Sequence, residues 1–224
     1  VETSALELTG ASIQEKETCS INSSLASKSH GTSVASILVS RNYGVAPDAT
    51  LLTYLTGSRQ DGDQPSSDCF DDTKHIKYGY AWLLNSAMND GAQIINLSSS
   101  STSQENELKW AIARSMAQGI IITASAGNED TDGNTTSLSQ WSGVVGVSAI
   151  GIDDSRQDYS SWGQGVTTAA VGGPLVVHDY SSGQVRQVSG TSVSAPIVAG
   201  TLALARQKWP NATSNQLLQL LVKT

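Results

Sequence analysis

The sequence predicts an α/β domain built on a mostly parallel β-sheet. Three largely apolar segments, Leu51–Leu55, Gln93–Leu97 and Ile120–Ala124, alternate with two stretches in which apolar residues recur at helical spacing. Continuous apolar strands are typical of parallel sheets, and strands that alternate with helices favour right-handed crossover connections. With 224 residues, the chain is long enough for one domain with a substantial core.

The first half of the chain contains two predicted helices. Residues 1–29 are polar and poorly patterned, and a short buried helix is expected over Gly31–Ser40, introduced by His30. The second helix is expected over Asp72–Asp90, because its apolar residues follow helical spacing, and Gly91 ends it.

A third helix is expected between the second and third strands. Thr102 and Glu105 form a capping box before it, and Gly119 ends it. Its predicted buried face consists of Leu108, Ala111, Ile112, Ser115 and Met116.

The second half predicts further strands and two more helices. The strands are Val144–Ala149 and Val166–Val171, followed by a hairpin of Leu175–Val177 and Val185–Val188. A long apolar helix follows Ser192. Ser214 caps the last helix, whose predicted buried face is Leu217, Leu218 and Leu221.

Composition excludes some classes of partner. The net charge of −7 argues against nucleic acid or an anionic membrane surface. No apolar run reaches the length of about 18 residues that a membrane span needs. The chain begins at Val1 without a leader pattern, so we expect a processed or trimmed chain. Cys19 and Cys69 fit either a disulfide in an oxidising compartment or two separate thiols.

The most informative stretch is Ser189–Gly200. A small-residue turn precedes Ser192, and the apolar residues that follow cover every face of a helix, which predicts a buried helix. Free N–H groups and the positive end of the helix dipole at this terminus favour negative charge. Ser192 therefore reads either as a nucleophile or as an ordinary N-cap serine.

Two other stretches favour the nucleophile. They are Ser29-His30-Gly31-Thr32-Ser33-Val34-Ala35 and Ala124-Ser125-Ala126-Gly127-Asn128. Together with Gly190-Thr191-Ser192-Val193-Ser194-Ala195-Pro196 they resemble, in family order, the HGT-x-VA, A-x-GN and GTS-x-[AS]-x-P motifs of the subtilisin-like serine proteases (subtilases). The resemblance implies a three-layer fold with helices on both faces of the sheet. It also implies one peptidase domain over residues 1–224, and leaves open whether the first strand is missing at the N-terminus.

Acyl transfer by serine needs a hydroxyl, a base, a group that orients the base, and donors for the oxyanion. By resemblance, Ser192 is the nucleophile and His30 is the general base. Asn128 and the Ser192 N–H form the oxyanion hole. A structural histidine at position 30, and an asparagine at 128 that merely accommodates a turn, are the alternatives.

The orienting acid is harder to place. Subtilases keep an aspartate in a stretch like V-x-D-[ST]-G before the histidine, but no aspartate precedes His30. The best match is Val1-Glu2-Thr3-Ser4-Ala5, with Glu2 at the aspartate position. Either Glu2 replaces the aspartate, or the aspartate lies on a removed or separate piece, or the triad is broken.

The resemblance also implies a substrate cleft between two segments. One contains Leu97, Ser98, Ser99 and Ser100, and the other contains Ser125, Ala126 and Gly127. A peptide would add to them as an extended strand. Because serines stand where subtilases carry glycines, we expect a narrow pocket that prefers a small or unusual side chain.

The sequence thus predicts a secreted or extracellular serine endopeptidase that acts on proteins or peptides. The resemblance leaves room for an N-terminal prodomain or a separate N-terminal piece. No cofactor is expected, and structural calcium, common in subtilases, has no recognisable binding loop here. The alternative is a non-catalytic subtilase-like module that binds peptides. A sedolisin-like enzyme, with glutamate as base, is disfavoured by the HGT stretch.

Overall fold

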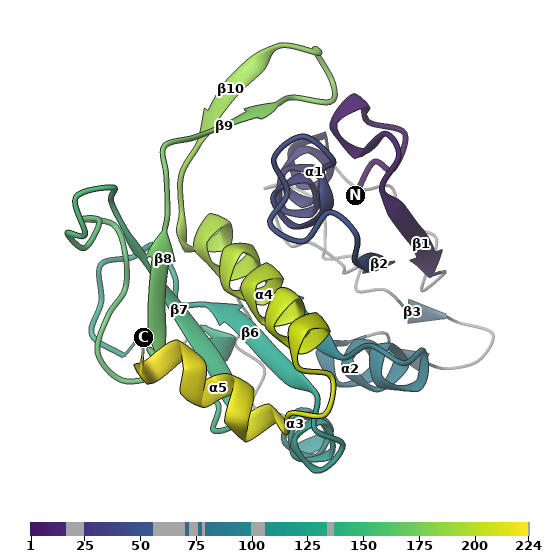
Figure 1. Ribbon diagram of the computed structural model, residues 1–224, viewed down its shortest axis with the longest axis vertical. Coiled ribbons are helices and arrows are strands. Elements are labelled where there is room, and N and C mark those ends of the chain that lie inside the picture. Colours follow the sequence, from purple (N-terminus) through teal and green to yellow (C-terminus); the bar gives the residue numbers. More distant parts are fainter. Residues whose placement is uncertain are drawn as a thin grey trace.

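The computed structural model describes residues 1–16, 25–55, 70–71, 76–77, 79–99, 106–133 and 137–223. Its centre is a parallel sheet in the order β5 (Ile94–Leu97), β6 (Ile121–Ser125), β7 (Val144–Ile150) and β8 (Thr168–Val171). Figure 1 shows this sheet with helices around it. The predicted mostly parallel α/β fold is confirmed.

Helices cover both faces of the sheet. On one face lie α4 (Thr191–Lys208) and α5 (Ser214–Lys223), and on the other lie α2 (Tyr80–Asn89) and α3 (Asn106–Ala117). Consecutive strand residues point to opposite faces, so Ile121 packs under α4 while Ile122 packs under α2 and α3. This confirms the three-layer arrangement.

The N-terminal region contains more structure than its sequence indicates. A short 3₁₀ helix, η1 (Leu6–Leu8), leads into β1 (Ser12–Lys16), which pairs in parallel with β2 (Thr50–Tyr54). β1 escapes prediction because Ile13 is its only apolar residue. The predicted start of the first helix at Gly31 is wrong, because α1 spans Leu25–Val39. Its first turn is too polar and exposed to show a hydrophobic period, although leucine, alanine and lysine there favour a helix.

The predicted helix over Asp72–Asp90 is too long. Two short strands, β3 (Phe70–Asp71) and β4 (Ile76–Lys77), pair antiparallel, and α2 begins only after Gly79. Residue 76 fits helical spacing by sequence alone, but its backbone is committed to pairing with β3. The predicted capping box at Thr102 and Glu105 and both cysteines lie outside the described residues.

Two side chains near helix ends differ from expectation. Met116 is 57 % exposed, because it lies over Gly143 at the edge of α3 instead of in the core. The last helix is capped by Thr213, whose hydroxyl accepts from the Gln216 N–H while the Gln216 side chain accepts from the Thr213 N–H. Ser214 instead donates to the Gly119 carbonyl.

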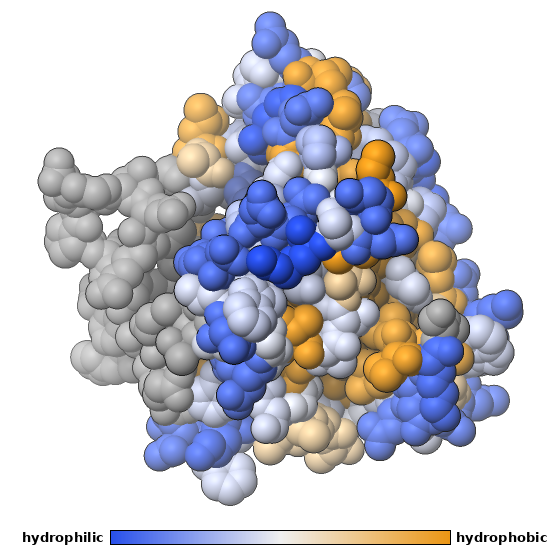
Figure 2. Space-filling view, turned by 90° about the vertical axis from the view of Figure 1, so that its left-hand side faces the viewer, coloured by the Kyte–Doolittle hydropathy of each residue, from blue (hydrophilic) through white to orange (hydrophobic). Residues whose placement is uncertain are grey.

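The predicted hairpin is confirmed as β9 (Leu175–His178) and β10 (Val185–Val188). One face of it is buried, where Val177 packs with Ile37 of α1 and Val193 of α4. Val176 and Val185 are exposed, and Figure 2 shows hydrophobic surface at the top of the molecule, where Figure 1 places the hairpin. The hairpin therefore packs against both α1 and the start of α4.

Candidate active site

Ser192 lies in the first turn of α4. The residue before the helix, Gly190, has φ +142°, a backbone conformation that L side chains rarely adopt, so glycine is needed there. Ser192 is half-buried, and its carbonyl accepts a hydrogen bond of 2.9 Å from Ser98 Oγ. The expected placement at the N-terminus of a buried helix is found.

Asn128 follows β6 and is held by the same helix terminus. Its Oδ1 accepts from the N–H of Thr191 at 2.8 Å and from Thr191 Oγ1 at 3.0 Å. Thr191 Oγ1 in turn accepts from the Gly127 N–H at 3.0 Å. These bonds fix Oδ1. A Cβ at Gly190 would lie 3.2 Å from both Asn128 Nδ2 and Ser192 Oγ. The amide donor and the hydroxyl therefore border one small space.

The two predicted cleft segments are each bonded to the start of α4. β5 ends at Leu97, and Ser98 after it is bonded to the Ser192 carbonyl. Ser99 Oγ accepts from the Tyr80 hydroxyl at 2.8 Å. Ser100 lies outside the described residues.

The second cleft segment follows the end of β6. Ser125 is its last residue, the Ala126 N–H donates to the Val147 carbonyl, and Gly127 is bonded to Thr191. Both predicted cleft segments are thus bonded to the start of α4, and the first is also bonded to α2 through Ser99.

His30 lies in the second turn of α1, a helix that packs against α4. Part of the residue is exposed, but surrounding protein desolvates the imidazole and lowers its pKa, and the positive charge of Arg186 lowers that pKa further. Arg186 Nη2 donates to Ser29 Oγ at 2.9 Å and to Ser33 Oγ at 3.0 Å. The imidazole is therefore favoured in its neutral form, which is the form of a general base.

Glu2 lies against the same helix but has other partners. Its N–H donates to Thr32 Oγ1 at 2.8 Å, and its carboxylate accepts from Ser4 Oγ at 2.7 Å and lies 3.9 Å from Lys28 Nζ. The Ser4 hydrogen bond lowers the pKa of Glu2. Residues two apart on a helix point about 200° apart. Lys28 and Thr32 therefore share a face that His30 does not, and the structure places the Glu2 carboxylate on that face.

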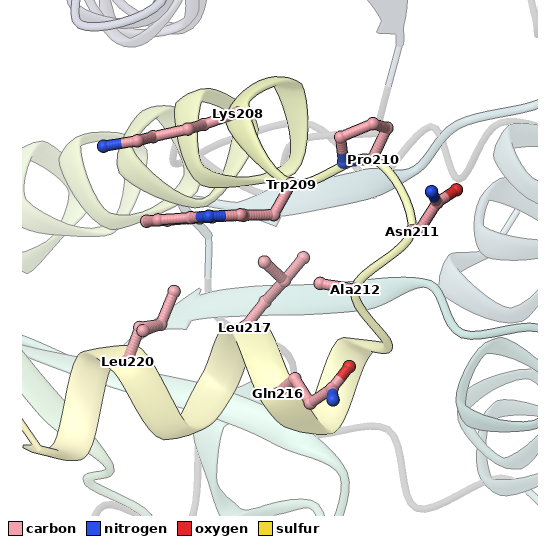
Figure 3. Close-up of a pocket in the computed structure, with 8 residues that line it drawn as sticks. All are labelled: Lys208, Trp209, Pro210, Asn211, Ala212, Gln216, Leu217 and Leu220. Atoms are coloured by element: carbon pink, nitrogen blue, oxygen red, sulfur yellow. The ribbon is translucent and has the colours of Figure 1, made fainter.

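A surface pocket lies elsewhere in the molecule. It has a volume of about 500 Å³ and lies between the end of α4 and α5 (Figure 3). The Lys208 ammonium lies 4.8 Å from the centroid of the Trp209 ring there. None of the predicted site residues lines this pocket. Within the described ranges, no three His, Cys, Asp or Glu side chains come together in a way that could hold a metal ion.

Three contributors to the site were not predicted from the sequence. Thr191 had a signal, since it stands directly before Ser192 in the motif. Arg186 reaches α1 from β10, and Tyr159 reaches the Gly190 loop from a distant segment. Nothing local in the sequence marks these two, because their contacts exist only after folding.

Comparisons with known proteins identify the family of the chain. The profile of the subtilase family (Peptidase S8) matches residues 11–224. A thermostable alkaline protease of Halalkalibacterium halodurans is 31% identical over 200 residues, covering 87% of this chain and 52% of the relative. Subtilisin E of Bacillus subtilis is 28% identical over 230 residues, covering 96% of this chain and 54% of the relative. The chain thus spans about half the length of these relatives.

A solved structure is also similar over the whole chain. The patellamide maturation protease PatA superposes with a TM-score of 0.77 at 25% identity, covering 100% of this chain and 82% of that one. The profile match, the sequence relatives and this superposition agree on one conclusion: the chain belongs to the subtilase family.

Proposed function

We propose that this chain is the peptidase domain of a serine endopeptidase that cleaves peptide bonds through an acyl-enzyme. The observation that supports this best is the shared space in front of Gly190, which Ser192 Oγ and Asn128 Nδ2 both border. A nucleophile and an oxyanion donor must meet at such a point. Membership of the subtilase family supports the same chemistry.

The proposed reaction uses three residues of this chain. Ser192 Oγ attacks the carbonyl carbon of the scissile bond while His30 accepts the hydroxyl proton. The oxyanion accepts hydrogen bonds from Asn128 Nδ2 and the Ser192 N–H. The C–N bond then breaks, His30 protonates the leaving amine, and a water molecule, deprotonated by His30, hydrolyses the acyl-enzyme and restores Ser192.

The proposed substrates are proteins or peptides in extended form. A substrate strand would lie between the segments after β5 and β6, with its backbone bonded to both. Ser100 and Ser101 stand where subtilases carry glycines and lie outside the described residues; their side chains support a preference for a small residue before the cleaved bond. A secreted location fits the bacterial subtilisins among the relatives. No helix in the described ranges has both the length and the apolar composition needed to cross a bilayer.

A second candidate is a peptide-binding module that does not cleave. The observation that favours it is the Glu2 carboxylate, which lies with Lys28 and Ser4 instead of His30. Incubation with a denatured protein, followed by mass spectrometry of the new termini, separates the two. Cleavage that is lost in Ser192→Ala supports the peptidase and also reports the preferred residue. Peptide binding without cleavage, by both the parent and Ser192→Ala, would support the module.

A further inference from the structure

One side chain outside the motifs contacts the backbone directly before the proposed nucleophile. The Tyr159 hydroxyl accepts a hydrogen bond of 3.1 Å from the Gly190 N–H and donates one of 2.7 Å to the Gly172 carbonyl. The Gly190 N–H also donates to that carbonyl, at 2.8 Å. The three groups form a closed triangle that links the end of β8 to the loop before α4.

The same segment holds the other half of the proposed oxyanion hole. The Tyr159 carbonyl accepts from the Asp130 N–H at 3.0 Å, two residues beyond Asn128. The Ser161 N–H donates to the Gly127 carbonyl at 3.0 Å, one residue before Asn128. The Asn128 loop and the Gly190 loop are therefore both bonded to one short stretch of chain.

Gly190 is a point at which such a restraint matters. Its φ of +142° lies in a region that residues with a side chain rarely adopt, and glycine itself offers no side-chain cap to the helix that follows. A rotation at Gly190 would move the Ser192 hydroxyl relative to the Asn128 amide, because both atoms border its Cβ position. The Tyr159 hydroxyl is the side-chain group that accepts a hydrogen bond from the Gly190 N–H.

The space around the hydroxyl is fitted to it. A methyl group at Gly172 would come within 2.8 Å of the Tyr159 oxygen and 2.3 Å of the Ala149 side chain. A glycine at 172 therefore lets the hydroxyl reach the backbone. Burial raises the pKa of Tyr159, so the hydroxyl is protonated at neutral pH and can donate.

We propose that Tyr159 is a positioning residue for the oxyanion hole, acting through Gly190 on the relative placement of Ser192 and Asn128. This inference rests on the proposed peptidase function. It concerns a hydroxyl that touches neither substrate nor reacting atoms, so its contribution is expected in the transition state, when the hole is filled, and not in substrate binding.

The test is Tyr159→Phe, which removes only the hydroxyl, compared with Tyr54→Phe as a matched control. The Tyr54 hydroxyl also donates a hydrogen bond, to Asp90 Oδ2, at the far end of β2. In Tyr159→Phe we expect kcat to fall roughly 5- to 10-fold, the factor that corresponds to one neutral hydrogen bond. KM should stay within about 2-fold, because uniform binding is not affected.

A transition-state mimic gives a readout that a merely structural role would not move. The affinity for a peptide aldehyde, whose adduct with serine carries an oxyanion, should fall by the same factor as kcat in Tyr159→Phe. The affinity of Tyr159→Phe for a non-covalent peptide inhibitor should stay unchanged. The kcat and KM of Tyr54→Phe should also stay unchanged. Equal kcat in parent and Tyr159→Phe, or equal losses of affinity for both inhibitors, would overturn the inference.

A second measurement does not depend on turnover. Hydrogen exchange of the peptide that covers residues 188–195 should be faster in Tyr159→Phe than in the parent, and unchanged in Tyr54→Phe. Faster exchange in Tyr159→Phe, together with a parent that cleaves nothing, would mean that the restraint exists and the proposed function fails. Equal exchange in Tyr159→Phe and in an active parent would refute the positioning role alone.

Discussion

Thr191 offers the sharpest test of how the candidate site is assembled. The residue is 1 % exposed, and its hydroxyl donates to Asn128 Oδ1 and accepts from the Gly127 N–H. Valine has the same shape without these bonds. In Thr191→Val, the Gly127 N–H loses the partner that the structure gives it, and the free energy of unfolding should fall by about 1–3 kcal/mol.

The same change should reduce turnover by a smaller factor than removal of Asn128 itself. Asn128→Ala deletes the proposed oxyanion donor, and loss of such a donor typically costs roughly 100- to 1000-fold in kcat. In Thr191→Val, Asn128 Oδ1 keeps its bond to the Thr191 N–H, so we expect a loss of roughly 10-fold.

Steady-state kinetics and urea unfolding of the parent, Thr191→Val and Thr191→Ser give both quantities. Thr191→Ser keeps the hydroxyl and should recover most of the turnover. Parental kcat in Thr191→Val, or a serine variant as slow as the valine variant, would refute the reasoning.

Three further substitutions test the roles of Arg186, Ser194 and Glu2. Arg186→Gln removes the positive charge that lowers the pKa of His30, so this pKa should rise, and the acidic limb of the kcat/KM–pH profile should move to higher pH; an acidic limb that stays in place or moves to lower pH would contradict this. Ser194→Ala removes a fully buried hydroxyl that has no hydrogen-bond partner among the described residues, and should stabilise the fold by roughly 1 kcal/mol in urea unfolding; a clear loss of stability would show that the hydroxyl has a partner. Glu2→Ala should leave turnover within a few-fold of the parent, because its carboxylate lies with Lys28 and Ser4; a fall by orders of magnitude would make Glu2 the orienting acid.

Local patterns in the sequence predict most of the fold. The strands β5, β6 and β7 are largely apolar, so their type and approximate bounds follow from composition. The order of the three motifs predicts the family. β1 and the first turn of α1 could not be found this way, because polar, half-exposed segments carry no hydrophobic period.

The candidate site is predictable only where it is local. Ser192, Asn128 and His30 stand in short motifs whose letters report their own turns and helix starts. Arg186 acts on α1 and Tyr159 on Gly190 across more than thirty residues of chain, through contacts that depend on how β10 and the segment before β8 are placed. The position of the Glu2 carboxylate likewise depends on a helix face, which a motif alignment does not report.

The central claim is that Ser192 is a nucleophile activated by His30. A fluorophosphonate reacts with activated serines, so labelling followed by intact mass and peptide mapping tests this claim directly. We expect a single adduct at Ser192 in the parent, and its loss in His30→Ala under the same conditions. Absence of the adduct in a folded parent sample, shown folded by circular dichroism, or equal labelling in His30→Ala, would contradict it.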